Sequence, residues 1–319
     1  MKIFKRFLVA TCSVALLAGL ALSGCGDNKT DETAAETTAA AEETTAAEET
    51  TAAEETTAAG AETDAEAETD AETSSANADV ATLLPDGVLK MGLDDSLPPM
   101  GFRDEKNEIV GFDVDVAREV AKHLDIELEL VPIDWSMKQQ ELDAENVDCL
   151  WNGYSWTEER AEACALTKPY MENMQVLVTM ADSNIQSLDD MAGKKLSLQE
   201  GSTAELALDD AAEFKDSLDE VVPFKENVTA FKDIEAGQTD GLLIDSIMAD
   251  YYIAQQDNPD NYLIVGDPLA VEDYVIAFRK DDTELRDLIE ATLVEMKEDG
   301  SLGAIATEWF GKDITTVGN

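Results

Sequence analysis

The sequence predicts an α/β protein with parallel-rich sheets, preceded by a disordered tail. Strand and helix patterns alternate from residue 84 onward, which is typical of parallel sheets built from βαβ units. Residues 26–80 consist almost only of Ala, Glu, Thr, Asp and Ser, a composition that cannot form a core. The chain has 319 residues, so its folded part is long enough for two domains.

The first elements follow from hydrophobic spacing. Val88–Leu93 is a mostly apolar run that predicts a strand. Asp113 is placed to cap a helix, because apolar residues recur at helical spacing at positions 116, 117, 120, 121 and 124. Ile126, Leu128 and Leu130 alternate with acidic residues, as in a half-exposed strand.

The later elements continue the alternation. A helix is predicted over 136–144 and a strand over 147–151. Further strands are predicted at 195–199, 221–224, 241–244, 262–265 and 274–278, with helices at about 203–212, 228–236, 246–256, 283–299 and 302–310. Gly237 and Gly300 stand where helices should end. In open sheets of this kind, ligands bind outside the carboxyl ends of strands.

Residues 1–24 are predicted to be a signal peptide. Three basic residues in the first six positions precede an apolar segment from Phe7 to Leu22. The segment ends in Leu22-Ser23-Gly24-Cys25, which resembles the bacterial lipoprotein box. This resemblance implies that Cys25 carries a lipid, becomes the first mature residue and anchors the protein to the outer face of the bacterial cytoplasmic membrane. An ordinary secretory signal with a chance Cys is the alternative.

The segment from the lipidated Cys25 to residue 80 is predicted to be a disordered acidic linker. Ala-Glu-Glu-Thr-Thr-Ala occurs three times in succession from Ala41. With so few large apolar residues, the segment cannot offset the entropy of ordering its backbone. A flexible chain of this length spans roughly 40 Å. A spacer role and simple low-complexity drift are both compatible with the composition.

Charge and histidine content exclude several classes of function. The chain carries 70 acidic and 22 basic side chains, a formal net charge of −48. Such a charge repels phosphate backbones, so no nucleic acid is expected as a partner. His123 is the single histidine, which excludes a His-rich metal site and any Ser-His-Asp triad without it.

Two cysteines, Cys149 and Cys164, remain in the folded part. Export through a membrane permits a disulfide between them. Their apolar neighbours instead favour two buried thiols, and the sequence leaves both states open.

The order of short motifs carries a family resemblance. They are GFDVD at 111–115, WNGYSWTEER at 151–160, TKPY at 167–170, GKK at 193–195, GSTAE at 201–205, DGLLID at 240–245 and EWFG at 308–311. This series resembles the extracellular solute-binding proteins of ABC importers for polar amino acids, of the family 3 type. The match covers about residues 84–311, nearly all of the folded part.

The resemblance implies a two-lobed, periplasmic-binding-protein-like (type II) clamshell. Its first lobe would comprise 81–170 plus 274–319 and its second lobe 175–268, joined by hinge strands at 171–174 and 269–273. A free polar L-amino acid would be held between the lobes without a cofactor and delivered to the permease subunits of an ABC importer.

The resemblance places Arg160 as the group that grips the ligand carboxylate. A planar guanidinium suits this task because it can bind a carboxylate bidentately; a surface pair with Glu158 or Glu159 is the alternative. Ser202 and Thr203 lie at a strand-to-helix turn, where free N–H groups favour an anion. Without the resemblance, this turn would be a plain helix cap.

Asp245 ends a buried-looking strand and is implied to hold the ligand ammonium; capping the next helix is the alternative. Ser155 and the carbonyl of Gly153 match family positions that also hold the ammonium. A Ser at such a position would otherwise be a turn residue.

The residues that would recognise the ligand side chain depart from the usual pattern of the family. The family commonly has an aromatic residue where this chain has Leu97, and Met100 replaces a second one. Trp135 occupies another usual aromatic position, although a Trp at this spacing is equally compatible with a core role. Asp94 matches a position that contacts amide or cationic ligand ends in relatives, or it is a solvated loop acid. With the negative charge, this favours glutamine, arginine, lysine or similar ligands.

We expect a binding protein and not an enzyme. A cyclohexadienyl or arogenate dehydratase on the same fold would need a general acid over the ligand, and only Glu172 or Asp94 could serve. An amino-acid sensor and a nutrient-independent adhesin are two further functions compatible with the resemblance.

Overall fold

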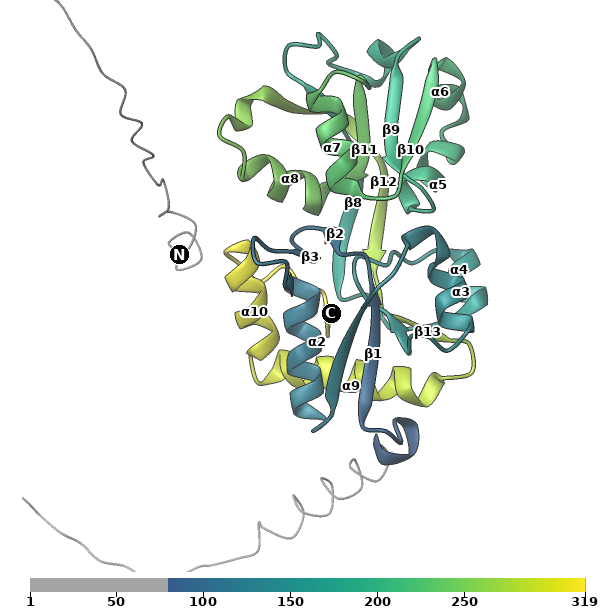
Figure 1. Cartoon of the computed structure of the whole chain (residues 1–319), viewed down its shortest axis with the longest axis vertical. Coiled ribbons are helices and arrows are strands. Elements are labelled where there is room, and N and C mark those ends of the chain that lie inside the picture. The colour runs from purple at the N-terminus through teal and green to yellow at the C-terminus, as the bar shows by residue number, and fades with distance from the viewer. Residues whose placement is uncertain (1–79, 319) are drawn as a thin grey trace, which may run out of the picture.

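The computed structural model describes residues 80–318. These residues form two α/β lobes, one above the other in Figure 1, each built on its own five-stranded sheet. The predicted signal peptide, the lipidated Cys25 and the acidic linker as far as residue 79 lie outside the described residues. Within residues 80–318, no helix is long and apolar enough to cross a membrane.

The sheet of the first lobe, the lower one in Figure 1, has the order β5-β1-β6-β13-β7. Its strands are β1 (Val88–Leu93), β5 (Glu127–Pro132), β6 (Cys149–Leu150), β7 (Cys164–Leu166) and β13 (Ala277–Arg279). β1 is parallel to β5 and β6, whereas β13 is antiparallel to β6 and β7. A small sheet of β2 (Ser96–Leu97), β3 (Gly101–Arg103) and β4 (Ile109–Val110) follows β1.

The sheet of the second lobe has the order β10-β9-β11-β8-β12. Its strands are β8 (Met171–Met180), β9 (Lys195–Gln199), β10 (Glu220–Phe224), β11 (Gly241–Asp245) and β12 (Tyr262–Tyr274). β9 is parallel to β10 and β11, and β8 is antiparallel to β11 and β12. Both sheets are therefore mixed, which confirms the α/β class and adds antiparallel strands to the predicted parallel ones.

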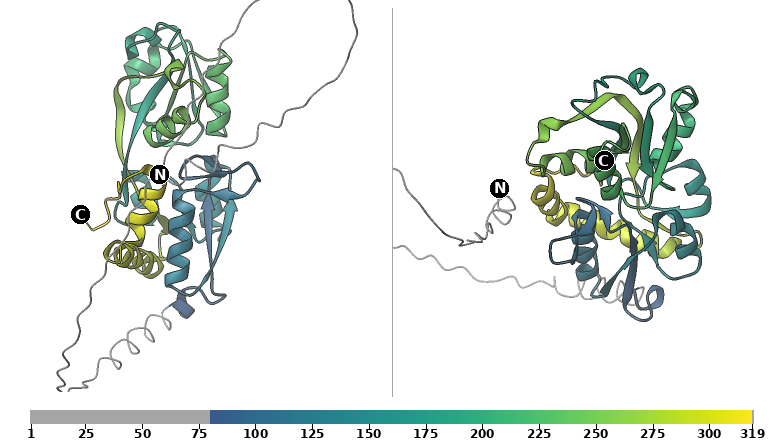
Figure 2. Two further views of the ribbon diagram at one scale, coloured as in Figure 1. Left: turned by 90° about the vertical axis from the view of Figure 1, so that its left-hand side faces the viewer. Right: turned by 45° about the horizontal axis from the view of Figure 1, so that its top comes forward.

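Two long strands connect the lobes. β8 and β12 run side by side between the two bodies in Figures 1 and 2. They pair from Met171 with Tyr274 to Gln175 with Ala270, and again beyond an irregularity between Val265 and Ala270. The sequence pattern predicted a strand at 262–265 and another from Tyr274, and the family resemblance implied a hinge strand at 269–273. One continuous strand was not predicted, because exposed and charged residues interrupt the apolar pattern after Val265.

Helices cover both sheets (Figure 2). The first lobe carries α2 (Phe112–His123), α3 (Lys138–Asp143), α4 (Glu158–Ala163), α9 (Thr283–Glu298) and α10 (Ser301–Phe310), and the short η2 (Trp135–Met137). The second lobe carries α5 (Thr203–Asp210), α6 (Ala212–Ser217), α7 (Asn227–Glu235) and α8 (Ser246–Ala254), with η3 (Leu188–Met191) and η4 (Pro259–Asn261).

Helix ends agree with the sequence at two glycines and differ at two other points. Gly237 and Gly300 follow helices with φ of 66° and 85°, as expected of residues that end helices. The helix predicted at 203–212 breaks at Ala211, which separates α5 from α6. The predicted cap by Asp113 is wrong, since α2 begins after Gly111 without a side-chain cap.

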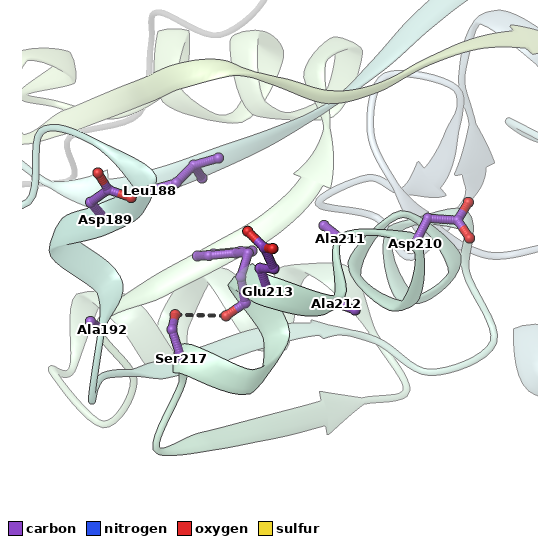
Figure 3. Close-up of a pocket in the computed structure, with 9 residues that line it drawn as sticks. Leu188, Asp189, Ala192, Asp210, Ala211, Ala212, Glu213 and Ser217 are labelled. Atoms are coloured by element: carbon purple, nitrogen blue, oxygen red, sulfur yellow. Dashed lines mark hydrogen bonds between the residues drawn. The ribbon is translucent and has the colours of Figure 1, made fainter.

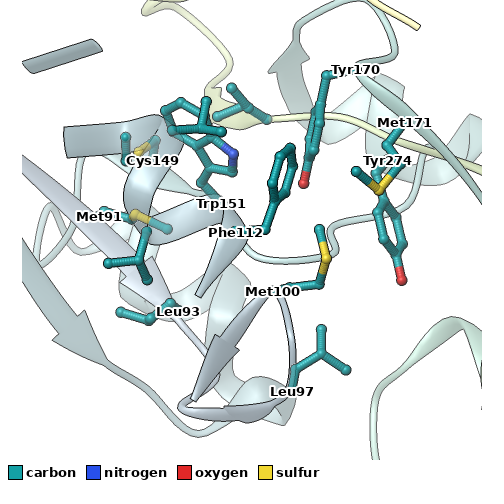
Figure 4. Packing of buried hydrophobic residues seen from close by; sticks show 14 of the residues in the cluster. Met91, Leu93, Leu97, Met100, Phe112, Cys149, Trp151, Tyr170, Met171 and Tyr274 are labelled. Atoms are coloured by element: carbon teal, nitrogen blue, oxygen red, sulfur yellow. The ribbon is translucent and has the colours of Figure 1, made fainter. Parts of the chain in front are cut away.

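Aromatic and sulfur-containing side chains fill the core of the first lobe (Figure 4). Phe112 is drawn between Trp151 and Tyr170, and all three are almost fully buried. The rings of Trp151 and Tyr170 lie 6.5 Å apart in an edge-on arrangement, which is one of the geometries that aromatic pairs prefer. This core fixes the segments that carry the candidate site.

Cys149 and Cys164 are free, buried thiols. The Cys164 thiol lies 3.3 Å from Oε1 of Gln139 and donates to it. Burial raises the pKa of both thiols, so neither is a reactive thiolate. The sequence left a disulfide and two thiols open, and the structure contains the two thiols.

Candidate functional site

The two lobes meet at a cluster of polar side chains. Ser155 follows β6 in the first lobe, and Thr203 is the first residue of α5 in the second. Their hydroxyl oxygens are 3.2 Å apart. The Ser155 hydroxyl also donates to Oε2 of Glu272 on β12, at 2.8 Å. The site therefore collects residues that lie far apart in the chain.

Arg160 lies at the edge of this cluster, in the first turn of α4. Its backbone N–H donates to the hydroxyl of the N-cap residue Thr157 at 3.1 Å. Its Nη1 donates to the carbonyl of Ser155 at 2.7 Å, and its guanidinium stacks 4.4 Å from the ring centroid of Tyr154. Among the described residues no carboxylate pairs with Arg160, so its charge is available to an anion.

Asp245 ends β11 with its carboxylate deep between the lobes. One oxygen, Oδ1, accepts hydrogen bonds from the amides of Asn173 and Gln175 and from the hydroxyl of Tyr274. The residue keeps some exposed surface, and no described side chain donates to Oδ2. Burial, followed by the nearby negative charge of Glu272, raises the pKa of Asp245 to about 7.

Glu272 shares its donors with Asp245. Asn173 and Gln175 each donate from one amide nitrogen to Oε2 of Glu272, both at 3.1 Å. Gln175 is fully buried, and its Oε1 has no hydrogen-bond partner. The two carboxylates thus converge on the same two amide donors, and the described residues supply no cation to them.

Asp94 is buried and reaches across to the second lobe. Its Oδ2 accepts from Nε2 of Gln199 at 2.6 Å and from Nδ2 of Asn227 at 3.3 Å, while the N–H of Ser96 donates to Oδ1. Burial raises the pKa of this carboxyl group. The alternative of a solvated loop acid is therefore wrong for Asp94.

Two lysines also cross between the lobes. Nζ of Lys138 donates to the carbonyl of Gly201 at 2.8 Å, and Lys225 forms an ion pair with Asp134. Burial and the charge of Arg160 lower the pKa of Lys138 to about 7. These two contacts join the lobes beside the polar cluster.

A buried acid supports the backbone of the site. Gly153 adopts a φ of 60°, and its N–H donates to Oδ2 of Asp113 at 3.1 Å. The hydroxyl of Tyr170 donates to the same oxygen at 3.0 Å. Burial raises the pKa of Asp113 to about 7. Asp113 therefore fixes the turn that carries Gly153 and leads to Ser155.

The remaining predicted residues lie close by in different roles. The Ser202 hydroxyl donates to the carbonyl of Gln199 at 2.8 Å, so it is directed at its own lobe. The Trp135 ring is buried edge-on against Tyr154, at 6.1 Å between centroids. Leu97 is buried beside Gly153, where its Cδ2 is 2.7 Å from the position of an added Cβ.

A surface hollow away from the polar cluster lies on the second lobe. It has a volume of about 660 Å³ and is formed by η3 and α6 of the second lobe (Figure 3). Asp189, Asp210 and Glu213 line it together with alanines, and it contains none of the predicted residues. Among the described residues, no group of His, Cys, Asp and Glu is arranged to hold a metal ion.

The family model of the bacterial extracellular solute-binding proteins, family 3, matches residues 89–312. The chain belongs to this family. The match spans both sheets and every residue of the polar cluster described above.

Several named proteins are similar to this chain over most of their own length. The L-cystine-binding protein TcyJ of Escherichia coli K12 is 28% identical over 231 residues, which is 72% of this chain and 85% of that protein. The substrate-binding protein of a Streptococcus pneumoniae ABC uptake transporter, solved with bound histidine, superposes with a TM-score of 0.72 and is 33% identical. That match covers 74% of this chain and 97% of the relative.

A further solved relative is Tv2483 bound to L-arginine. It superposes with a TM-score of 0.71 and is 28% identical, and the match covers 76% of this chain and 98% of the relative. These relatives are binding proteins, and they differ in the amino acid that they bind.

Four polar residues of the site were not predicted from the sequence. Asn173 and Gln175 are buried on β8, Glu272 joins them from β12, and Lys138 spans the lobes from α3. One signal was present: Asn173 and Gln175 are two positions apart in a strand whose other residues are mostly apolar, so they share a face. Glu172, considered as a general acid, is exposed and alternates to the opposite face of β8.

Proposed function

We propose that this protein is the substrate-binding component of an ABC importer and captures a free polar L-amino acid between its lobes. The main supporting observation is the arrangement of charges at the polar cluster. Arg160 offers a cation that pairs with no described carboxylate, and Asp245 and Glu272 offer carboxylates that no described Lys or Arg contacts. A zwitterion needs such a pair of opposite partners, because desolvating its two charges is costly unless each is matched.

In this proposal, Arg160 and the N-terminus of α5 at Ser202 and Thr203 bind the ligand carboxylate. Asp245, the Ser155 hydroxyl and the Gly153 carbonyl bind its ammonium. Asp94, Trp135 and Leu97 border the side chain. The buried charge of Asp94 favours an amide or cationic end, so glutamine, arginine and lysine are the expected ligands; the arginine, histidine and cystine of the relatives widen the set to be tested.

We further propose that the lobes comprise 81–170 plus 274–319 and 175–268, with hinges at 171–174 and 269–273. The support is that β8 and β12 are the two paired strands that pass between the sheets. A ligand that contacts both lobes favours the closed state through those contacts.

Thermal melting against the twenty amino acids and cystine tests this function. A ligand at a hundred times its Kd adds about 2.7 kcal/mol of stability, or roughly 5–10 °C for a protein of this size. We expect such a shift with one or a few polar members, together with compaction in small-angle scattering. No shift with any of them, and an unchanged scattering curve, would argue against the proposal.

Anchoring is a separate part of the proposal. The family is extracellular, and the Leu22-Ser23-Gly24-Cys25 segment supports a lipid on Cys25. We expect Cys25→Ala to move the protein from the membrane fraction into the medium, or to leave the signal peptide uncleaved. Fractionation followed by mass measurement distinguishes these results from an unchanged, membrane-bound protein, which would contradict lipidation.

A further inference from the structure

We propose that Asp245 and Glu272 act as one carboxylate pair, which holds a shared proton before the ligand binds and releases it to solvent when the ligand ammonium enters. Glu272 is then a specificity-determining residue that makes binding depend on a ligand cation at this end of the cleft. This inference rests on the proposed amino-acid-binding function.

Asp245 and Glu272 share a set of hydrogen-bond donors. Asn173 and Gln175 each contact Oδ1 of Asp245 and Oε2 of Glu272 through the same amide nitrogen. Two carboxylates that share two donors lie close together, and like charges at such distances cannot both ionise without a large cost. One proton held between the two carboxylates removes this repulsion.

Groups from both lobes surround the pair. β8 supplies neutral amides, β12 the Tyr274 hydroxyl, and the opposite lobe the Ser155 hydroxyl. Arg160 reaches the cluster only through the carbonyl of Ser155. No described Lys or Arg donates to either carboxylate, so a proton or a ligand cation is left to balance the charge.

Gln175 holds an unused acceptor. Oε1 of Gln175 is buried without a partner, although its amide nitrogen serves Thr203, Asp245 and Glu272. A buried acceptor without a donor is destabilising. An ammonium group brings three donors, enough for both carboxylates and one further acceptor. The elevated pKa of Asp245, partly caused by Glu272, agrees with a pair that is protonated before the ligand binds.

The exchange balances in charge. The singly protonated pair loses H⁺ to water and gains the R–NH₃⁺ group of the ligand, and no covalent bond to carbon or nitrogen changes. Affinity must therefore rise with pH. The pKa of Asp245 is about 7. Below this pH the affinity should increase by up to tenfold per pH unit, and above it the affinity should level off.

Isothermal titration calorimetry in buffers of different ionisation enthalpy counts the released protons. The full chain is titrated with L-arginine, L-lysine, L-glutamine, L-histidine and L-cystine, and the probe that binds best is used from pH 5.5 to 8. We expect proton release close to one per ligand at pH 6, and a release at least halved, with a flatter pH profile, in Glu272→Gln. Asp273→Asn is the matched control, because it removes an exposed negative charge from the adjacent position of β12.

The outcomes separate the two proposals. Wild-type release that falls in Glu272→Gln and persists in Asp273→Asn supports the pair. Binding without proton release, or equal release in both variants, overturns the pair and leaves amino-acid binding intact. Failure of every probe to bind overturns the proposed function itself. Any titration of the ligand's own groups cancels, because all variants are compared with the same probe.

Discussion

Replacing Arg160 by alanine is expected to weaken amino-acid binding at least about a hundredfold. The substitution leaves the ligand carboxylate desolvated between the lobes without a cation. Loss of one partner of a buried, hydrogen-bonded charge pair costs about 3–5 kcal/mol, which corresponds to a factor of at least about a hundred in Kd. The guanidinium lies over the Tyr154 ring and donates to the Ser155 carbonyl within its own lobe, and no carboxylate among the described residues pairs with it.

Calorimetry with the best-binding amino acid measures this loss, and two variants control it. Arg160→Lys keeps the charge and loses the planar fork, so it should bind with intermediate affinity. Arg118→Ala removes an exposed arginine that pairs with Asp115 on α2, and it should bind like the unaltered protein. If Arg160→Ala bound as tightly as Arg118→Ala, Arg160 would not be the carboxylate anchor.

The sequence predicted those parts of the fold that rest on local patterns. Val88–Leu93 forms β1 over its whole predicted length, because an apolar run bounded by polar turns has few competing conformations. The apolar pattern did not predict β8, and only the family resemblance implied a hinge strand at 171–174 within it. Its first residues alternate between buried apolar or amide side chains and exposed ones, and the role of this alternation is visible only when the distant strand β12 pairs with it.

The residues of the candidate site differ in the same way: some were predictable from local sequence and others were not. Residues within motifs, such as Arg160 and Thr203, could be selected from their neighbours and from the family resemblance. Glu272, Asn173 and Gln175 could not, since their importance depends on a convergence of three strands. Asp113 is an intermediate case. Its place at the start of a helix suggested a cap, but the fold instead directs its carboxylate to the Gly153 backbone and the Tyr170 hydroxyl.

The second large effect is expected for Gly111→Ala, which should destabilise the protein by more than about 3 kcal/mol. Gly111 precedes α2 with a φ of 150°, and an added Cβ would lie 2.2 Å from the Met100 carbonyl oxygen. Backbone atoms cannot move aside cheaply here. The N–H groups of Phe112 and Asp113 bond to the carbonyls of Pro99 and Met100, so a shift at Gly111 would displace the whole start of α2.

The loss should also reach the binding site, because α2 carries Asp113 and Asp113 holds the turn at Gly153. Thermal and denaturant unfolding measure the stability change, and about 3 kcal/mol corresponds to a melting temperature lowered by at least roughly 6 °C. Gly193→Ala is the matched control, since Gly193 has a φ of 70° and no atom within 4 Å of an added Cβ. It should cost only the strain of a left-handed alanine, about 1 kcal/mol. Equal losses in the two variants would show that backbone conformation, and not the contact with Met100, determines the requirement for glycine at position 111.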